Sequence, residues 1–302
     1  MTGVTVVTPA TVTGRRVVGT DTLDAVLPWL PEGRTLVAEG RGELFFRRHR
    51  HADPDAPTLL LLHGWTASAD LQFFAAYEAL AEHYSFVAID HRGHGRGPRP
   101  SEPFTLEDAM EDAAALVRAL GIESVVTVGY SMGGPISLLL ARAYPALVRA
   151  MIVQATAMDW NESLFERVRW KTVRVISPMV RSWAYPRSVR FAIKKLLGPG
   201  HPLAVYAPWL AGELHRNDAF ALVQAGQALS RFDARPWTVA LGKPAGSLIT
   251  TRDRLVKPRR QRELATALDA AVEEIEADHL AALVNPQEYT EATLRLLQRV
   301  VH

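Results

Sequence analysis

The feature that most constrains the fold of this chain is the pentapeptide Gly-Tyr-Ser-Met-Gly at residues 129–133. Residues 124–128, directly before it, form an apolar run that predicts a buried strand, and residues 133–144 predict a helix. In a tight turn from strand to helix only residues without bulk fit two positions either side of a serine, and backbone strain pushes the hydroxyl out at the end of the sheet. The pattern predicts Ser131 as a nucleophile, with the backbone N–H of Met132 as a donor to an oxyanion. An ordinary glycine-rich turn is the alternative, and the flanking strand and helix argue against it.

Elsewhere short apolar runs alternate with amphipathic stretches, which is typical of βα units and a mostly parallel sheet. We expect strands at residues 34–38, 42–48, 58–62, 85–90, 124–128, 148–155, 247–251 and 272–276, and helices at 106–120, 133–144, 259–268 and 287–301. The segment between residues 157 and 237 interrupts this rhythm with a helical pattern, prolines and aromatic residues. The sequence therefore predicts a core of residues 1–156 and 238–302, with a helical cap of residues 157–237 over the carboxyl edge of the sheet, where open α/β sheets hold their sites.

The general base is expected after an acid in chain order, because this architecture places its partners in the order serine, acid, histidine. Of the ten histidines only His279 and His302 lie beyond the candidate acids. His279 follows the expected strand at 272–276 and so stands on a loop at the active edge, whereas His302 is the terminal residue. We expect His279 to be the base, with a surface histidine as the alternative.

The acid is expected at Asp253, which follows the strand at 247–251. From there its carboxylate can reach the imidazole N–H and stabilise the imidazolium. Asp159, after the preceding strand, is the rival, because some triads take their acid from that place. Asp278 is closer in sequence to His279, but neighbouring side chains on an extended loop diverge.

A second oxyanion donor is expected in the loop after the apolar run 58–62, where His63-Gly64-Trp65 stands. The backbone N–H of Trp65 is the natural candidate. His63 is a second candidate base, but a histidine at the end of a strand usually makes loop hydrogen bonds, and we favour that interpretation.

Five segments occur in order: LLLLHGW, DHRGHGRG, GYSMGG, TTRDRLVKP and ADHL. In these segments the chain resembles the α/β-hydrolase superfamily in its capped esterase/lipase-like branch, and it is similar to hydrolases of actinobacteria. The resemblance covers residues 34–301 and leaves the cap unassigned. It implies an eight-stranded, mostly parallel sheet flanked by helices, a cap inserted after the sixth strand, an acyl-enzyme and no cofactor. Serine often stands where this chain has Gly97, a departure that leaves the triad untouched.

The composition excludes several other classes of function. The chain has 302 residues, 22% of them charged, with a net charge of +2, so no basic field suggests nucleic acid. It has no cysteine, which excludes disulfides, a thiol nucleophile and cysteine-ligated metal. His49-Arg50-His51 is at strand spacing for a metal but reads better as a surface tract, so no metal site is expected. The N-terminal residues lack a signal-peptide pattern and no apolar run reaches about 18 residues, so we expect a cytoplasmic protein.

The expected cap contains a basic stretch, residues 167–195, with nine lysines and arginines and no acidic residue. It is interpreted either as a surface that meets anionic lipid or as a solvated face over a cap whose apolar side covers the pocket. We favour the second interpretation. The oligomeric state is not indicated by any pattern in the chain.

Three functions are compatible with these patterns. The first is a carboxylester hydrolase that acts on small-to-medium apolar acyl substrates. The second is thioester or carbon–carbon bond hydrolysis on the same triad, which fold and triad do not separate. The third is a non-catalytic protein that uses a hydrolase pocket to hold a small ligand, and an intact triad argues against it.

Overall fold

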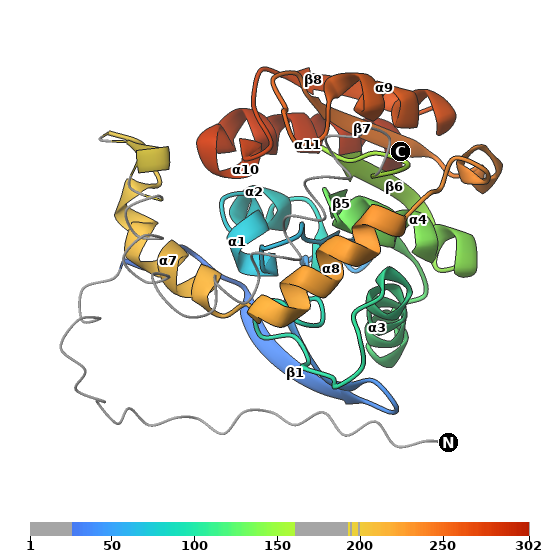
Figure 1. The fold of residues 1–302 in the computed structure, drawn as a ribbon, viewed down its shortest axis with the longest axis horizontal. Helices are drawn as coiled ribbons and strands as arrows, with labels where there is room; N and C mark the ends of the chain where they lie inside the picture. The colour runs from blue at the N-terminus through green and yellow to red at the C-terminus, as the bar shows by residue number, and fades with distance from the viewer. Residues whose placement is uncertain (1–25, 161–192, 194, 199, 302) are drawn as a thin grey trace.

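A computed structural model describes residues 26–160, 193, 195–198 and 200–301 of the chain. Its centre is an eight-stranded sheet in the order β1-β2-β4-β3-β5-β6-β7-β8 (Figure 1). The strands are β1 Glu32–Ala38, β2 Gly42–His49, β3 Thr58–Leu62, β4 Ser85–Ile89, β5 Val125–Tyr130, β6 Val148–Gln154, β7 Ala245–Thr250 and β8 Ala271–Ile275. Only the pairings of β2 with β1 and with β4 are antiparallel. The predicted eight-stranded, mostly parallel sheet is confirmed.

Helices cover both faces of this sheet, which explains why its inner strands are apolar without alternation. The helices are α1 Ala69–Phe73, α2 Tyr77–Ala81, α3 Leu106–Ala119, α4 Gly133–Ala143, α7 Ala207–His215, α8 Ala219–Arg231, α9 Pro258–Ala267, α10 Ala281–Val284 and α11 Pro286–Val301. In β3, Leu60 and Leu62 belong to the apolar cluster under α3 and α4, whereas Leu59 and Leu61 belong to the cluster under α1, α2 and α11. Short 3-10 turns span Ala204–Tyr206 and Thr238–Leu241.

The chain leaves the sheet after β6 and returns to it at β7, and the described part of this interval is helical. In it, α7 packs against α1 and α8 packs against α3 (Figure 1). Most of the basic stretch at 167–195 lies outside the described residues. No helix in the described ranges is long and apolar enough to cross a membrane.

The turn between α7 and α8, residues 216–218 (the α7–α8 elbow), and the end of α7 are held by polar contacts to the loop of residues 90–99. The Asn217 side chain accepts a hydrogen bond from the Gly95 N–H at 2.8 Å and donates one to the Thr66 carbonyl at 2.8 Å. The Arg96 guanidinium forms an ion pair with the buried carboxylate of Glu213 at 2.7 Å and lies 3.3 Å from that of Asp70. Buried carboxylates are tolerated only when they are paired in this way. These contacts fix the elbow on the core.

The same loop buries a cluster of neutral histidines beside His63. The ring centroids of His63 and His91 are 4.2 Å apart, and those of His63 and His94 are 5.4 Å apart. His63 makes loop hydrogen bonds, since its Nε2 accepts from the His91 N–H and its Nδ1 donates to the Gly64 carbonyl. Burial lowers the pKa of His91 to about 3 and that of His94 to about 4. It also lowers the pKa of His63 well below its usual value.

These histidines make the fold sensitive to acid. Below the unfolded pKa of about 6.5, the unfolded chain binds protons that the native state excludes. The contribution of these neutral histidines to the free energy of unfolding is therefore fully present above about pH 6.5. It is lost as the pH falls toward their pKa values in the folded state, near 3 and 4. We expect Tm to fall steeply below about pH 6.5. In His91→Leu, the slope of the free energy of unfolding against pH should be smaller by about 1.4 kcal/mol per pH unit. Thermal unfolding across this range measures both slopes, and equal slopes would contradict the explanation.

Candidate active site

The sharp turn after β5 presents Ser131 at the carboxyl end of the sheet. Ser131 has a φ of 51°, in the left-handed region, which a non-glycine residue adopts only under local strain. A side chain on Gly129 would collide with the Gly133 carbonyl, and one on Gly133 would collide with the Leu62 carbonyl. The Ser131 N–H donates to the Gln154 carbonyl of β6 at 2.8 Å, which ties the strained residue to the neighbouring strand. The two glycines are therefore required by close backbone approach.

His279 lies on the loop after β8 and contacts both other members of the expected triad. Its Nε2 is 2.9 Å from the Ser131 Oγ, and its Nδ1 is 2.7 Å from the Asp253 Oδ2. The Tyr130 hydroxyl donates to the His279 carbonyl at 3.0 Å and so holds the loop against β5. This geometry lets Nδ1–H donate to the carboxylate while Nε2 accepts the serine proton.

The carboxylate of Asp253 is buried in a shell of hydrogen-bond donors. Its Oδ1 accepts from the N–H groups of Leu255 and Val256 at 2.8 and 2.9 Å. Its Oδ2 accepts from the Thr250 hydroxyl at 2.9 Å and from the Gln261 amide at 3.2 Å, in addition to His279. These donors fix the orientation of the carboxylate. Sequence reasoning missed Gln261, since nothing in the α9 sequence marks it as a partner of a distant loop.

The rival acids have other partners. The carboxylate of Asp159 forms an ion pair with the buried guanidinium of Arg260 at 2.7 Å. Asp278, on an exposed loop, accepts from the Leu280 N–H at 2.8 Å. Of the three candidate acids Asp253, Asp159 and Asp278, Asp253 is the one that contacts His279.

The two expected oxyanion donors belong to segments next to the serine: Met132 follows it in the chain, and Trp65 follows Gly64, whose Cβ position would lie 3.3 Å from the Ser131 Cβ. Met132 is the N-cap residue of α4, and its N–H donates no hydrogen bond to another described residue. Trp65 follows Gly64 in the loop after β3, and its indole N–H donates to the Leu222 carbonyl of α8 at 2.7 Å. The next residue, Thr66, has a φ of 66° and receives the hydrogen bond of Asn217. The Trp65 loop is thus fastened to the α7–α8 elbow.

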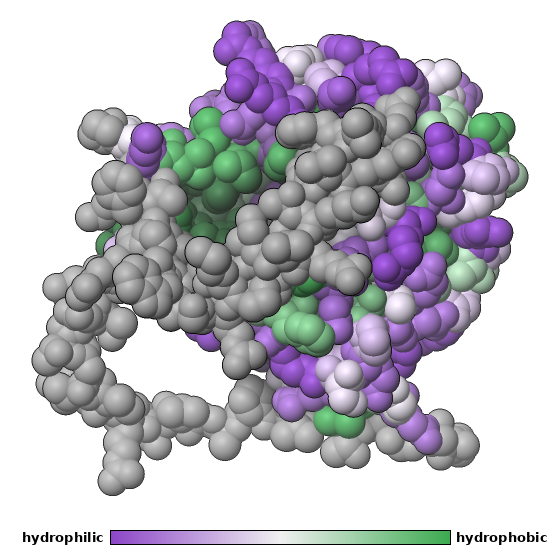
Figure 2. Space-filling view, viewed as in Figure 1, coloured by the Kyte–Doolittle hydropathy of each residue, from purple (hydrophilic) through white to green (hydrophobic). Residues whose placement is uncertain are grey.

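A cavity of about 550 Å³ opens beside Ser131 and His279. Most of its wall is aliphatic, and Figure 2 shows apolar residues gathered around a hollow near α10. The lining residues include Leu71, Ile193, Leu196, Leu197, Leu210, Leu214, Leu229, Leu255, Leu280 and Leu283. No charged side chain stands among the described residues of this wall, apart from the titratable His279. The cavity suits an uncharged, apolar ligand.

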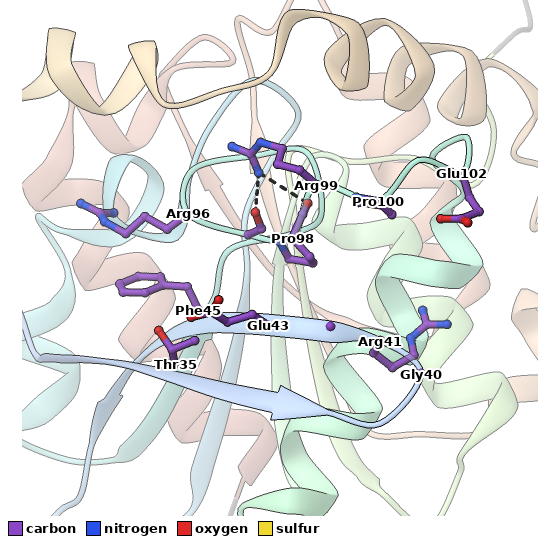
Figure 3. A pocket seen from close by; sticks show the side chains of 12 residues that line it. Thr35, Gly40, Arg41, Glu43, Phe45, Arg96, Pro98, Arg99, Pro100 and Glu102 are labelled. Atoms are coloured by element: carbon purple, nitrogen blue, oxygen red, sulfur yellow. Dashed lines mark hydrogen bonds between the residues drawn. The ribbon is translucent and has the colours of Figure 1, made fainter. Parts of the chain in front are cut away.

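A second cavity, of about 710 Å³, lies between the β1–β2 hairpin and the loop after β4 (Figure 3). None of the triad residues lines it. The Arg99 guanidinium at its edge donates to the carbonyls of Gly95 and Arg216, both at 2.7 Å, and Arg96 is paired with Glu213. Its guanidinium groups therefore already have protein partners. Within the described ranges, no group of three or more acidic or histidine side chains is placed to hold a metal.

Comparison with known proteins agrees with this fold. Residues 57–170 match the model of a family described as the alpha/beta hydrolase fold. A protein of Agrobacterium fabrum named "Putative carbamate hydrolase RutD" is 28% identical over 84% of this chain and 97% of its own length. A bifunctional esterase/perhydrolase of Acinetobacter calcoaceticus is 33% identical over 33% of this chain. With that esterase and two further curated relatives the match spans only 34% to 37% of the relative's length.

A solved structure extends the likeness to most of the chain. The enol-lactonase of Burkholderia xenovorans LB400 superposes with a TM-score of 0.75 at 22% identity. The superposition covers 87% of this chain and 99% of the lactonase. At this identity the likeness concerns the fold.

Proposed function

The chain belongs to the α/β-hydrolase superfamily, and from that premise we propose that it is a serine hydrolase that cleaves carboxylic esters. The observation that carries the proposal is the unbroken chain of hydrogen bonds from Asp253 through His279 to Ser131, at the wall of an apolar cavity. Its substrates are uncharged acyl compounds of small to medium size. The chemistry requires no cofactor and no metal, because the nucleophile is activated by the adjacent base.

The proposed reaction has two halves. In the first, Ser131 Oγ attacks the ester carbonyl while His279 Nε2 takes the hydroxyl proton, and Asp253 stabilises the imidazolium that forms. The N–H groups of Trp65 and Met132 bind the oxyanion, and each donor contributes about 3 kcal/mol. His279 then gives its proton to the departing alcohol and leaves an acyl group on Ser131. In the second half, His279 activates water, which hydrolyses the acyl-enzyme.

The wall of the cavity favours the binding of apolar substrates over charged ones. A carboxylate on the substrate would lose its hydration there without gaining a cationic partner among the described lining residues. Each methylene moved from water to an apolar wall is worth about 0.8 kcal/mol. We therefore expect kcat/KM to rise about threefold to fourfold with each added methylene until the cavity is filled.

A substrate panel tests this proposal. We expect hydrolysis of neutral straight-chain esters from acetate to laurate, with the rise in kcat/KM described above, and complete loss of turnover after treatment with a serine-directed phosphonate. Acyl thioesters and a carbon–carbon bond substrate, assayed beside them, separate the reactions that share this triad. Faster turnover of the thioesters at equal chain length would replace the ester assignment. Absence of turnover in every arm would contradict the assignment as an enzyme of this type.

A further inference from the structure

One amide side chain, that of Gln72, lines the active-site cavity next to the nucleophile. The Gln72 Oε1 and the Ser131 Cβ each lie 3.3 Å from the point that a Cβ on Gly64 would occupy. Because Gly64 has no side chain, the amide of Gln72 reaches the space directly beside Ser131. The rest of the wall is mostly apolar, with the aromatic side chains of Trp65, Tyr130 and Trp160 among aliphatic residues. Thr66, the other lining residue with a small polar side chain outside the triad, is exposed.

The short helix that carries Gln72 is held rigidly. The Ser68 hydroxyl accepts from the Leu71 N–H at 3.1 Å, and the Asp90 carboxylate accepts from the Ala69 N–H at 2.7 Å. Asp70, the neighbour on the helix, forms an ion pair with Arg47 at 2.7 Å. Of the α1 residues, Leu71 and Gln72 line the cavity, and Gln72 is the polar one. A polar group on such a helix is oriented before a ligand binds, which favours selectivity.

The side-chain amide of Gln72 makes no hydrogen bond to another described residue, although it can donate two and accept two. Since the amide oxygen and nitrogen exchange places by a simple flip, it can offer either a donor or an acceptor to a ligand. A polar group in an apolar cavity is most stable when a ligand or water satisfies it. The substrate group that lies beside the scissile carbonyl is the partner within reach.

We propose that Gln72 is a specificity-determining residue that hydrogen-bonds an oxygen of the substrate a few bonds from the scissile carbonyl. The preferred substrates are then aliphatic esters that carry a hydroxyl or keto oxygen close to the ester group, rather than plain fatty-acid esters. The oxygen belongs either to the acyl chain or to the alcohol, and the chemistry of recognition is the same in both cases. This inference rests on the proposed ester hydrolysis at Ser131.

The test compares matched esters in the wild type and in Gln72→Met, which keeps the length of the side chain and removes its hydrogen-bonding groups. One pair of esters differs by a hydroxyl or a methyl at the β position of the acyl chain, and the other by a terminal hydroxyl or methyl on the alcohol. In the wild type we expect kcat/KM to favour the hydroxyl member of one pair. In Gln72→Met the preference in that pair should fall roughly tenfold, because a neutral hydrogen bond is lost. The pair that responds identifies the side of the ester that Gln72 contacts.

Gln227→Met is the matched control, because Gln227 lies on α8 and does not line the cavity. It should leave both preference ratios as in the wild type. Equal preference ratios in the wild type and Gln72→Met would overturn the inference. This holds even if kcat/KM falls by the same factor for both members of a pair, since that result indicates only a structural role.

Binding to inactive protein separates this inference from the proposed reaction. In a Ser131→Ala background, calorimetry with the same intact esters gives the ratio of Kd values between the hydroxyl and methyl members of each pair. This ratio is compared with and without the further substitution Gln72→Met. A shift in that ratio without any turnover in the wild type would support the role of Gln72 and contradict ester hydrolysis. Turnover in the wild type with no shift in either ratio would contradict the role of Gln72 alone.

Discussion

Ser131→Ala is expected to reduce kcat for ester hydrolysis by several orders of magnitude, on the order of 10⁶ where a triad acts as a unit. Without the hydroxyl, His279 has no nucleophile to activate, although its Nδ1 still contacts Asp253 at 2.7 Å. Any residual rate comes from water that attacks a carbonyl still held by the oxyanion donors. Single-turnover and steady-state kinetics on one neutral ester measure the loss.

The control for this variant is Ser230→Ala, in α8. The Ser230 hydroxyl donates only to the Gln227 carbonyl of its own helix, at 2.7 Å, so its removal should change neither kcat nor the unfolding temperature appreciably. Activity near the wild-type level in Ser131→Ala, with Ser230→Ala also active, would exclude Ser131 as the nucleophile.

Asp253→Asn is expected to lower kcat at neutral pH by about 10³–10⁴-fold. The N–H groups of Leu255 and Val256 keep the oxygen of the new amide at the Oδ1 position, so its NH2 group faces His279. An NH2 donor requires an acceptor at His279 Nδ1, which moves the ring proton to Nε2. In that tautomer Nε2 cannot take the proton of Ser131, whereas substrate binding and KM should change little. Steady-state kinetics gives both constants.

Asp159→Asn is the matched comparison, because this residue was the rival acid. It removes the charge opposite Arg260, whose side chain is only 3% exposed. Breaking a buried ion pair from one side destabilises a fold by about 3–5 kcal/mol, and by less where a partner is partly exposed as Asp159 is. We expect a lower unfolding temperature with kcat within a few-fold of the wild type. A larger loss of kcat in Asp159→Asn than in Asp253→Asn would move the acid to the loop after β6.

The fold, and the loops on which Ser131, Asp253 and His279 stand, could be predicted because each rests on a local pattern in the sequence. A strand, a tight turn and a helix around Ser131 leave one arrangement of the backbone, and parallel strands bring their following loops to one edge. Ser131, Asp253 and His279 each follow such a strand, so the order of strands places them within hydrogen-bond distance.

The remaining features depend on packing between distant segments. The roles of Gln261 and Asn217 follow from the angles at which α9 and the α7–α8 elbow meet the core, and no periodicity in the chain encodes those angles. Helices α1 and α2 have five residues each, which is too short for a 3.6-residue period to stand out, so Gln72 could not be placed at the cavity. The division into core and cap remains a prediction from the sequence.

The most direct test of the central claim is to locate the covalent adduct. The protein is treated with a fluorophosphonate, and separately with an ester whose acyl-enzyme hydrolyses slowly, and the modified peptide is identified by mass spectrometry. The triad predicts one adduct in each case, on the peptide that contains Ser131, and none in Ser131→Ala. An adduct on another residue, or an active enzyme that forms none, would contradict a serine mechanism at this site.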